Sequence, residues 1–168
     1  RSSATPPAAR TQTTPAVGPD PGNVFGQGKN VPLIAMAHFI PYVATASVAD
    51  LRDLEYKVEK AMAVHGARYL HVHVPCPLGW GSPTGDTIKV ARLAVESGLY
   101  PLFEAEYGEV TGRRTIRKRV PVDEYLKTQS RFAHLFKGGR NEKSLAQIQA
   151  IADRNIKRFG LLAEGAVA

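Results

Sequence analysis

Residues 41–75, "PYVATASVADLRDLEYKVEKAMAVHGARYLHVHVP", carry the pattern that decides the fold class. Residues 41–48 predict a short buried strand, and residues 67–75 predict a second strand. Between them, residues 50–65 have the periodicity of an amphipathic helix, and Gly66 follows at a typical helix end. The apolar face of this helix consists of Leu51, Leu54, Val58, Ala61 and Met62. A strand, a helix and a second strand in this order favour a parallel pair joined by a helical crossover.

Further elements are expected on both sides of this unit. Helices are predicted at residues 32–39, 84–98 and 122–136, the second with Thr84 or Asp86 as N-cap and Gly98 as its stop. Residues 102–117 predict two short strands around a turn. Asn141 is expected to cap a last amphipathic helix with Leu145, Ile148, Ala152 and Ile156 on one side. These elements together predict an α/β domain.

The composition is typical of one soluble globular domain. The chain has 168 residues, of which 43% are hydrophobic and 22% charged, which is enough to enclose a core. No apolar run approaches the roughly 20 residues that span a bilayer, and no signal peptide is visible. We therefore expect no membrane association and a cytoplasmic location. The single cysteine excludes an internal disulfide.

Residues 1–28 differ from the rest, because proline, glycine, serine and threonine dominate there without an apolar period. This composition predicts a loop or linker. We expect an extended loop at residues 1–30, followed by one domain at residues 31–168. Two parallel strands are few for a stable sheet, so the fold is expected to be incomplete on its N-terminal side. The small residues at 163–168 are consistent with a complete C-terminal end.

The chain is basic, with a formal charge of +7. Five of the positive charges lie in "RRTIRKR" at residues 113–119. On a strand, one face of this stretch would carry Arg113, Thr115, Arg117 and Arg119. Such a face suits a solvated edge strand or a docking surface for an acidic partner. Nucleic-acid binding is not expected, because interleaved aromatic residues and a known motif are both missing.

Cys76 lies just past the carboxyl end of the second predicted strand, in "HVHVPCPLGW" at residues 71–80. In open α/β sheets, ligands bind outside the carboxyl ends of strands. Pro75 and Pro77 restrict the backbone, so we expect a rigid loop that continues neither strand nor helix. A thiolate held there suits a metal ligand, a nucleophile or a redox sensor. The alternative is a buried cysteine that packs as a small hydrophobe.

His71 and His73 are two residues apart on the same predicted strand, so they share a face. With Cys76 they suggest a zinc site, for which further ligands would have to come from elsewhere. Because nothing else in the chain has metal-ligand spacing, we favour two histidines packed beneath a helix and hydrogen-bonded to neighbours.

Several segments resemble, in the same order, the thiamine-diphosphate-binding β subunit of the pyruvate:ferredoxin oxidoreductase family. They are "IPYVATASV" to "VPCPLGW" at residues 40–80, residues 85–111 and residues 121–136. "RSSATP" at residues 1–6 resembles the segment after the family's cofactor loop. The resemblance implies the C-terminal half of that subunit. It therefore implies part of a thiamine-diphosphate-binding α/β fold, with a mostly parallel sheet flanked by helices.

This resemblance implies that Cys76 is one of four thiolate ligands of a [4Fe–4S] cluster, with the other ligands outside this chain. The family's acidic Gly-Asp-Gly motif for thiamine diphosphate and Mg²⁺ is absent from these residues. The implied enzyme decarboxylates a 2-oxo acid, reduces ferredoxin or a similar acceptor and transfers the acyl group to coenzyme A. The implied partners are the other subunits of the same complex, of α, γ and δ type.

Pyruvate is the favoured substrate of the implied enzyme, because "PCPLGW" resembles the pyruvate-type members more than the 2-oxoglutarate type. Oxalate, phenylglyoxylate and branched 2-oxo acids are alternatives. A non-catalytic α/β interaction module that kept the fold without the cofactors is an alternative of a different class. Ser2, Ser3 and Thr5 would follow the cofactor loop, but we expect them to be ordinary turn residues.

Overall fold

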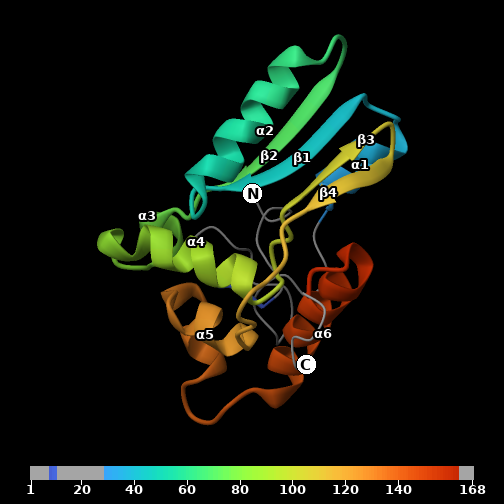
Figure 1. Cartoon of the computed structure of the whole chain (residues 1–168). Coiled ribbons are helices and arrows are strands. Elements are labelled where there is room, and N and C mark those ends of the chain that lie inside the picture. Colours follow the sequence, from blue (N-terminus) through green and yellow to red (C-terminus); the bar gives the residue numbers. More distant parts are fainter. Residues whose placement is uncertain (1–7, 11–28, 163–168) are drawn as a thin grey trace.

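The computed structural model describes residues 8–10 and 29–162. These residues form an α/β fold in which helices flank a four-stranded sheet (Figure 1). The predicted α/β class is therefore confirmed. Most of the predicted loop at residues 1–30, including Ser2, Ser3 and Thr5, lies outside the described residues. Within the described ranges, no helix combines the length and apolar character needed to cross a bilayer.

The elements agree closely with the sequence pattern. The strands are β1 (Tyr42–Ser47), β2 (Arg68–His73), β3 (Phe103–Glu106) and β4 (Glu109–Arg113). The α-helices are α1 (Val31–Ala37), α2 (Leu51–Ala63), α3 (Pro77–Trp80), α4 (Thr87–Glu96), α5 (Val122–Lys127) and α6 (Glu142–Phe159). Two short 3-10 helices are η2 (Thr84–Asp86) and η3 (Ser130–Leu135). The helix predicted at residues 122–136 is thus two helices, separated where Gln129 adopts an extended backbone.

The sheet has the strand order β2-β1-β3-β4. β1 and β2 are parallel, with Tyr42 opposite Arg68 and Ser47 opposite His73, as the strand–helix–strand pattern predicted. β3 runs antiparallel to both β1 and β4. Its pairing with β4 follows from the tight turn between them, in which Gly108 has a φ of 89°. The expectation of a mostly parallel sheet is thus corrected for the described part, which is a mixed sheet with one parallel pairing.

Helices cover both faces of the sheet. On one face, Ala61 of α2 packs in a cluster with Tyr42 and Ala44 of β1. On the other face, Phe159 of α6 stacks on Phe103 of β3 with 4.4 Å between ring centroids. α4, α5 and α6 form a second core beside the sheet (Figure 1). Its buried side chains include Val90, Ala94, Leu126, Phe132, Leu145, Ile148 and Ala152.

The face of α2 that packs on the sheet is not the predicted apolar face. Its buried residues are Lys57 and Ala61, whereas Leu51, Val58 and Met62 are 65%, 41% and 69% exposed. Of the predicted apolar face, only Ala61 is therefore part of the described core. The reason is that β2 is the outermost strand on this side of the described sheet, so no further strand lies beneath the apolar stripe.

The basic stretch is not an extended strand, because β4 ends at Arg113. Arg114 pairs with Asp50 at 2.6 Å, and Arg119 pairs with Asp153 at 2.5 Å. Ile116, between them, is buried. The predicted alternation of basic residues on one strand face is therefore wrong, although β4 is the edge strand of the described sheet.

Candidate functional site

Cys76 lies where the parallel pair of strands ends. Val74 and Pro75 connect β2 to it, and the helical turn α3 begins at the next residue. The backbone of Cys76 is extended, and its carbonyl accepts a hydrogen bond from the Trp80 amide at 3.0 Å. The expectation of no helix here is wrong, because the fixed φ of Pro77 suits the first position of a helix. The thiol is exposed, so the alternative of a buried hydrophobe is also wrong.

The loop that carries Cys76 packs against η3 and is hydrogen-bonded to it. Gly81 ends α3 with a φ of 66°, and its carbonyl accepts a hydrogen bond from the Ser130 amide at 3.1 Å. A Cβ atom at Gly81 would lie 1.7 Å from Ser130 Oγ. Only glycine therefore fits, both for its left-handed backbone and for the space. The contact between Gly81 and Ser130 therefore fixes the end of the loop that carries Cys76 against η3.

Behind the thiol, the two histidines of β2 pack among aromatic rings. The His73 ring centroid lies 4.7 Å from that of Tyr100 and 5.7 Å from that of Trp80. The hydroxyl of Tyr69 lies 3.2 Å from His71 Nδ1. Tyr100 donates its hydroxyl hydrogen to the His71 carbonyl at 2.6 Å. The histidines are thus packing residues, as favoured from the sequence, but they pack against aromatic rings, and only His71 has the predicted hydrogen bond to a neighbour.

The surroundings keep both histidines neutral. Burial lowers the pKa of His73 to about 4, and the positive charge of Arg131 adds to this effect. Burial also lowers the pKa of His71. The Nδ1 atom of His73 is buried and has no hydrogen-bond partner among the described residues. In the same part of the chain, no three His, Cys, Asp or Glu side chains converge on a metal position, so the zinc alternative gains no support.

Arg131 of η3 is the functional candidate that sequence reasoning missed. It is only 5% exposed, and its Nε donates to Gln129 Oε1 at 2.9 Å. Its guanidinium lies over the Trp80 ring. Burial lowers the pKa of Arg131, while the nearby ionisable groups of Tyr125 and Cys76 oppose that effect. The predicted continuous helix at residues 122–136 concealed this position, and no spacing in the sequence marked it.

A cavity of about 590 Å³ opens beside this group. Its lining includes His71, His73, Trp80, Tyr100 and Arg131. The cavity thus combines neutral aromatic surface with one buried positive charge. Such a lining is suited to an anionic group in apolar surroundings.

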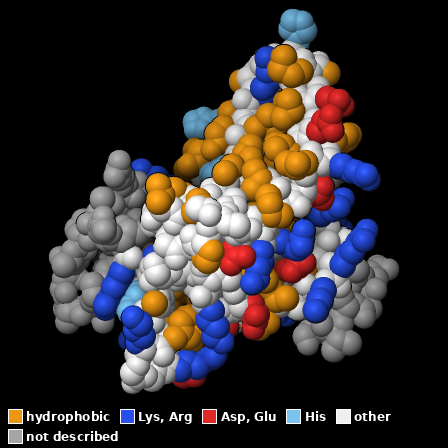
Figure 2. Space-filling view, turned by 90° about the vertical axis from the view of Figure 1, so that its left-hand side faces the viewer, with side chains coloured by type: hydrophobic (Ala, Val, Ile, Leu, Met, Phe, Trp, Pro, Cys, Tyr) orange, Lys and Arg blue, Asp and Glu red, His pale blue; other side chains and the backbone are white. Residues whose placement is uncertain are grey.

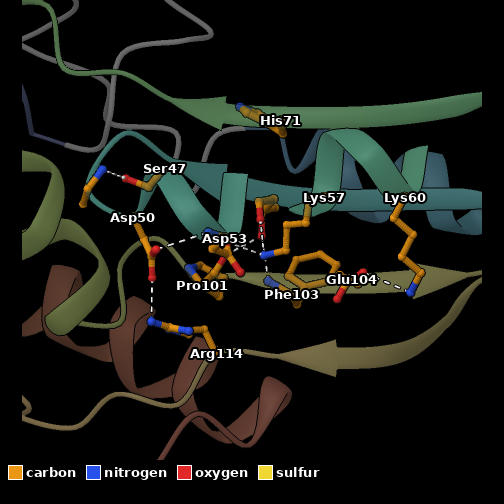
Figure 3. A network of polar contacts seen from close by, with 12 residues as sticks. Ser47, Asp50, Asp53, Lys57, Lys60, His71, Pro101, Phe103, Glu104 and Arg114 are labelled. Atoms are coloured by element: carbon orange, nitrogen blue, oxygen red, sulfur yellow. Dashed lines mark hydrogen bonds and ion pairs between the residues drawn. The ribbon is translucent and has the colours of Figure 1, made fainter. Parts of the chain in front are cut away.

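A second polar network lies under α2 and fixes the helix to the sheet (Figure 3). Lys57 Nζ donates to the Thr45 carbonyl at 2.9 Å and pairs with Asp53 at 2.7 Å. Thr45 Oγ1 in turn accepts a hydrogen bond from the Phe103 amide at 2.9 Å. Lys60 pairs with Glu104 at 3.1 Å. Because the buried Lys57 ammonium is both paired and hydrogen-bonded, we assign this network to stability.

Comparison with known proteins identifies the family. Pyruvate synthase subunit PorB of Methanosarcina barkeri is 48% identical to this chain over 161 residues, which are 96% of the chain and 54% of that subunit. The same subunit of Methanocaldococcus jannaschii is 42% identical over 161 residues, 96% of the chain and 52% of that subunit. The chain belongs to the β-subunit family of the 2-oxoacid:ferredoxin oxidoreductases.

This β-subunit family also has members with a different name. Ketoisovalerate oxidoreductase subunit VorB of Pyrococcus abyssi is 41% identical over 139 residues, 82% of this chain and 44% of that subunit. The chain spans about half the length of the curated relatives it matches. No profile of a known family matches the chain. The membership therefore rests on the individual β-subunit relatives.

Proposed function

We propose that this chain is part of the β subunit of a thiamine-diphosphate-dependent 2-oxoacid:ferredoxin oxidoreductase and supplies one thiolate, Cys76, to a [4Fe–4S] cluster. The observation that carries the proposal is the exposed thiol of Cys76 at the end of β2. It stands in a chain that is 48% identical to a pyruvate synthase subunit. Because the thiol is exposed, a cluster whose other ligands lie outside this chain could reach it.

The chemistry of the donor fits such a cluster. Iron–sulfur clusters are held by thiolates, and Cys76 is the only cysteine among the 168 residues. The chain therefore contributes one ligand, and the other thiolates come from elsewhere in the enzyme. As a cluster ligand, Cys76 would serve electron transfer and not nucleophilic attack.

The other cofactors are held mainly by residues outside this chain. Thiamine diphosphate with Mg²⁺, when bound, supplies the electron sink that lets a 2-oxo acid lose carbon dioxide. The overall reaction converts the 2-oxo acid and coenzyme A to acyl-CoA, carbon dioxide and a proton. The two electrons released reduce two molecules of ferredoxin or a similar one-electron acceptor. The other subunits of the complex are the partners of this chain.

Pyruvate is the substrate that the comparisons favour. The relatives with 48% and 42% identity are named as pyruvate synthase subunits. A branched 2-oxo acid is second, because a ketoisovalerate oxidoreductase subunit is 41% identical. Oxalate and phenylglyoxylate are further alternative substrates, but none of the relatives described above is named for either of them.

The test is the variant Cys76→Ser in the assembled enzyme complex. We expect it to lose or convert one cluster, seen as a lower iron content and an altered electron paramagnetic resonance spectrum. Pyruvate-dependent reduction of ferredoxin should stop. Leu78→Ser is the matched control, because Leu78 lies in the same loop and is 95% exposed. A Cys76→Ser complex with unchanged iron, spectrum and activity would show that Cys76 is not a cluster ligand.

A further inference from the structure

The outer side of α2 and the free edge of β2 form one uncovered apolar surface. Its exposed side chains are Leu51, Val58 and Met62 from α2, and Val72 and Val74 from β2 and the residue that follows it. We refer to these five residues as the α2–β2 surface. Figure 2 shows hydrophobic side chains gathered over the part of the molecule where these two elements lie. Single exposed apolar residues are ordinary, but a contiguous group marks an interaction site.

The spacing of the α2 residues indicates that this side of the helix is made to be covered. Leu51, Val58 and Met62 follow one another at intervals of seven and four residues, which places them on one stripe of the helix. A neighbouring side of α2 is already buried on the sheet through Lys57 and Ala61. α2 therefore has two faces suited to burial, and only one of them is covered by described residues.

The edge of β2 supports the same conclusion. All six residues of β1 are buried, whereas all six residues of β2 are at least partly exposed to solvent. Strands in parallel pairing are usually covered on both faces and lie inside a sheet. β2 is nevertheless the outermost strand on its side of the described sheet. Its outward backbone groups are thus a template for one more strand.

The opposite edge of the sheet is built differently. β4 begins with Glu109 and ends with Arg113, and Arg114 follows directly. Charged side chains along an edge strand discourage further pairing. β2 carries no acidic residue, and its only permanently charged side chain is Arg68 at the first position. Of the two edges, β2 is therefore the one suited to accept a strand.

We propose that the α2–β2 surface binds the part of the β subunit that the relatives possess and that has no counterpart in these 168 residues. That part adds a strand beside β2 and lays apolar side chains over the stripe of α2. Its length is sufficient, because close to half of the Methanosarcina barkeri subunit has no counterpart in this chain. The inference rests on membership of the β-subunit family and is independent of the role of Cys76.

The experiment co-expresses this chain with a tagged polypeptide that consists of the part of the Methanosarcina barkeri subunit without a counterpart here. Val58→Glu and Val110→Glu are the matched variants, since the two valines are 41% and 39% exposed and lie on α2 and β4. We expect Val58→Glu to reduce co-purification at least tenfold and Val110→Glu to leave it unchanged. In the wild-type complex, the β2 amides should gain protection from hydrogen exchange.

Equal melting temperatures of the two variants and the wild-type chain, measured alone, establish that each is folded. Met62→Glu provides a second variant on the same stripe and should behave like Val58→Glu. The proposal is overturned if Val110→Glu weakens the complex as much as Val58→Glu does, or if the β2 amides gain no protection. A stable dimer of the chain alone that Val58→Glu dissociates would also overturn it. None of these measurements requires iron, so failure of the Cys76 assignment is recognised separately.

Discussion

The guanidinium carbon of Arg131 lies 4.0 Å from the centroid of the Trp80 ring. Trp80 ends the helical turn after Cys76, and Arg131 belongs to η3. In the described part of the structure, no carboxylate forms an ion pair with this buried arginine. Its charge is instead balanced by the face of the ring and by the side-chain oxygens of Gln129 and Tyr125. The contact therefore joins the helical core to the loop that presents the thiol.

Replacing Arg131 by Met should destabilise the chain and loosen the loop. A desolvated contact between a guanidinium and an indole contributes about 2 kcal/mol, so we expect the free energy of unfolding to fall by about that amount. Because Trp80 is the only tryptophan, its fluorescence reports this contact directly and should shift to longer wavelength. Urea unfolding followed by tryptophan emission measures both effects.

Arg158→Met is the control for this prediction. The Arg158 guanidinium lies 6.0 Å from the Phe159 ring and the residue is exposed, so its loss should change the free energy of unfolding by less than about 0.5 kcal/mol. Similar losses for both variants would show that burial of Arg131 against Trp80 has no special importance.

His73 should make the stability of the chain depend on pH. Its pKa is about 4 in the folded chain, against an ordinary value of 6.5, so between these values the unfolded chain binds more protons. The free energy of unfolding therefore rises with pH in this window and falls as the pH drops from about 6.5 to about 4. The expected change is up to about 3 kcal/mol.

The variant His73→Phe should flatten this dependence, because phenylalanine keeps a ring beside Tyr100 and does not titrate. Urea unfolding at a series of pH values between 4 and 7 measures the slope. His65→Phe is the control, since His65 is exposed beyond the end of α2. If the slope of the His73→Phe variant matched that of the wild-type chain, the buried neutral state of His73 would be refuted.

Gly81→Ala should displace the loop that carries Cys76. The new Cβ atom would clash with Ser130, and the positive φ would strain any residue other than glycine. We expect a loss of roughly 1–3 kcal/mol in the free energy of unfolding and a shift in Trp80 emission. Gly85→Ala is the control, because a Cβ there meets open space. A Gly81→Ala chain as stable as the control would mean that the loop adapts freely.

The secondary structure was largely predictable from local pattern. The apolar runs of β1 and β2, and the cap of α6, where Asn141 Oδ1 accepts a hydrogen bond from the Ser144 amide at 3.0 Å, depend on neighbours in sequence. The break before η3 was not predictable, because Gln129 is extended where its side chain bonds to Tyr125 and Arg131. Those contacts compete with helix propensity, which is only a weak preference.

The candidate site was predictable only in part. The position of Cys76 at the carboxyl end of a strand followed from the order of the elements. The roles of Arg131 and Tyr100 did not, because neither residue lies near Cys76 in the sequence. Their contacts with Trp80 and His73 exist only after α4, α5 and η3 have packed beside the sheet.

The amino-acid sequence by itself determined the parallel β1–α2–β2 unit and the placement of the only cysteine just beyond it, since both follow from periodicity and chain order. It also determined that α2 carries an apolar stripe. Only the tertiary structure decided that this stripe faces outward while Lys57 is buried on the sheet. The physical reason is that periodicity places residues on a common face, but burial depends on which distant segments lie against that face.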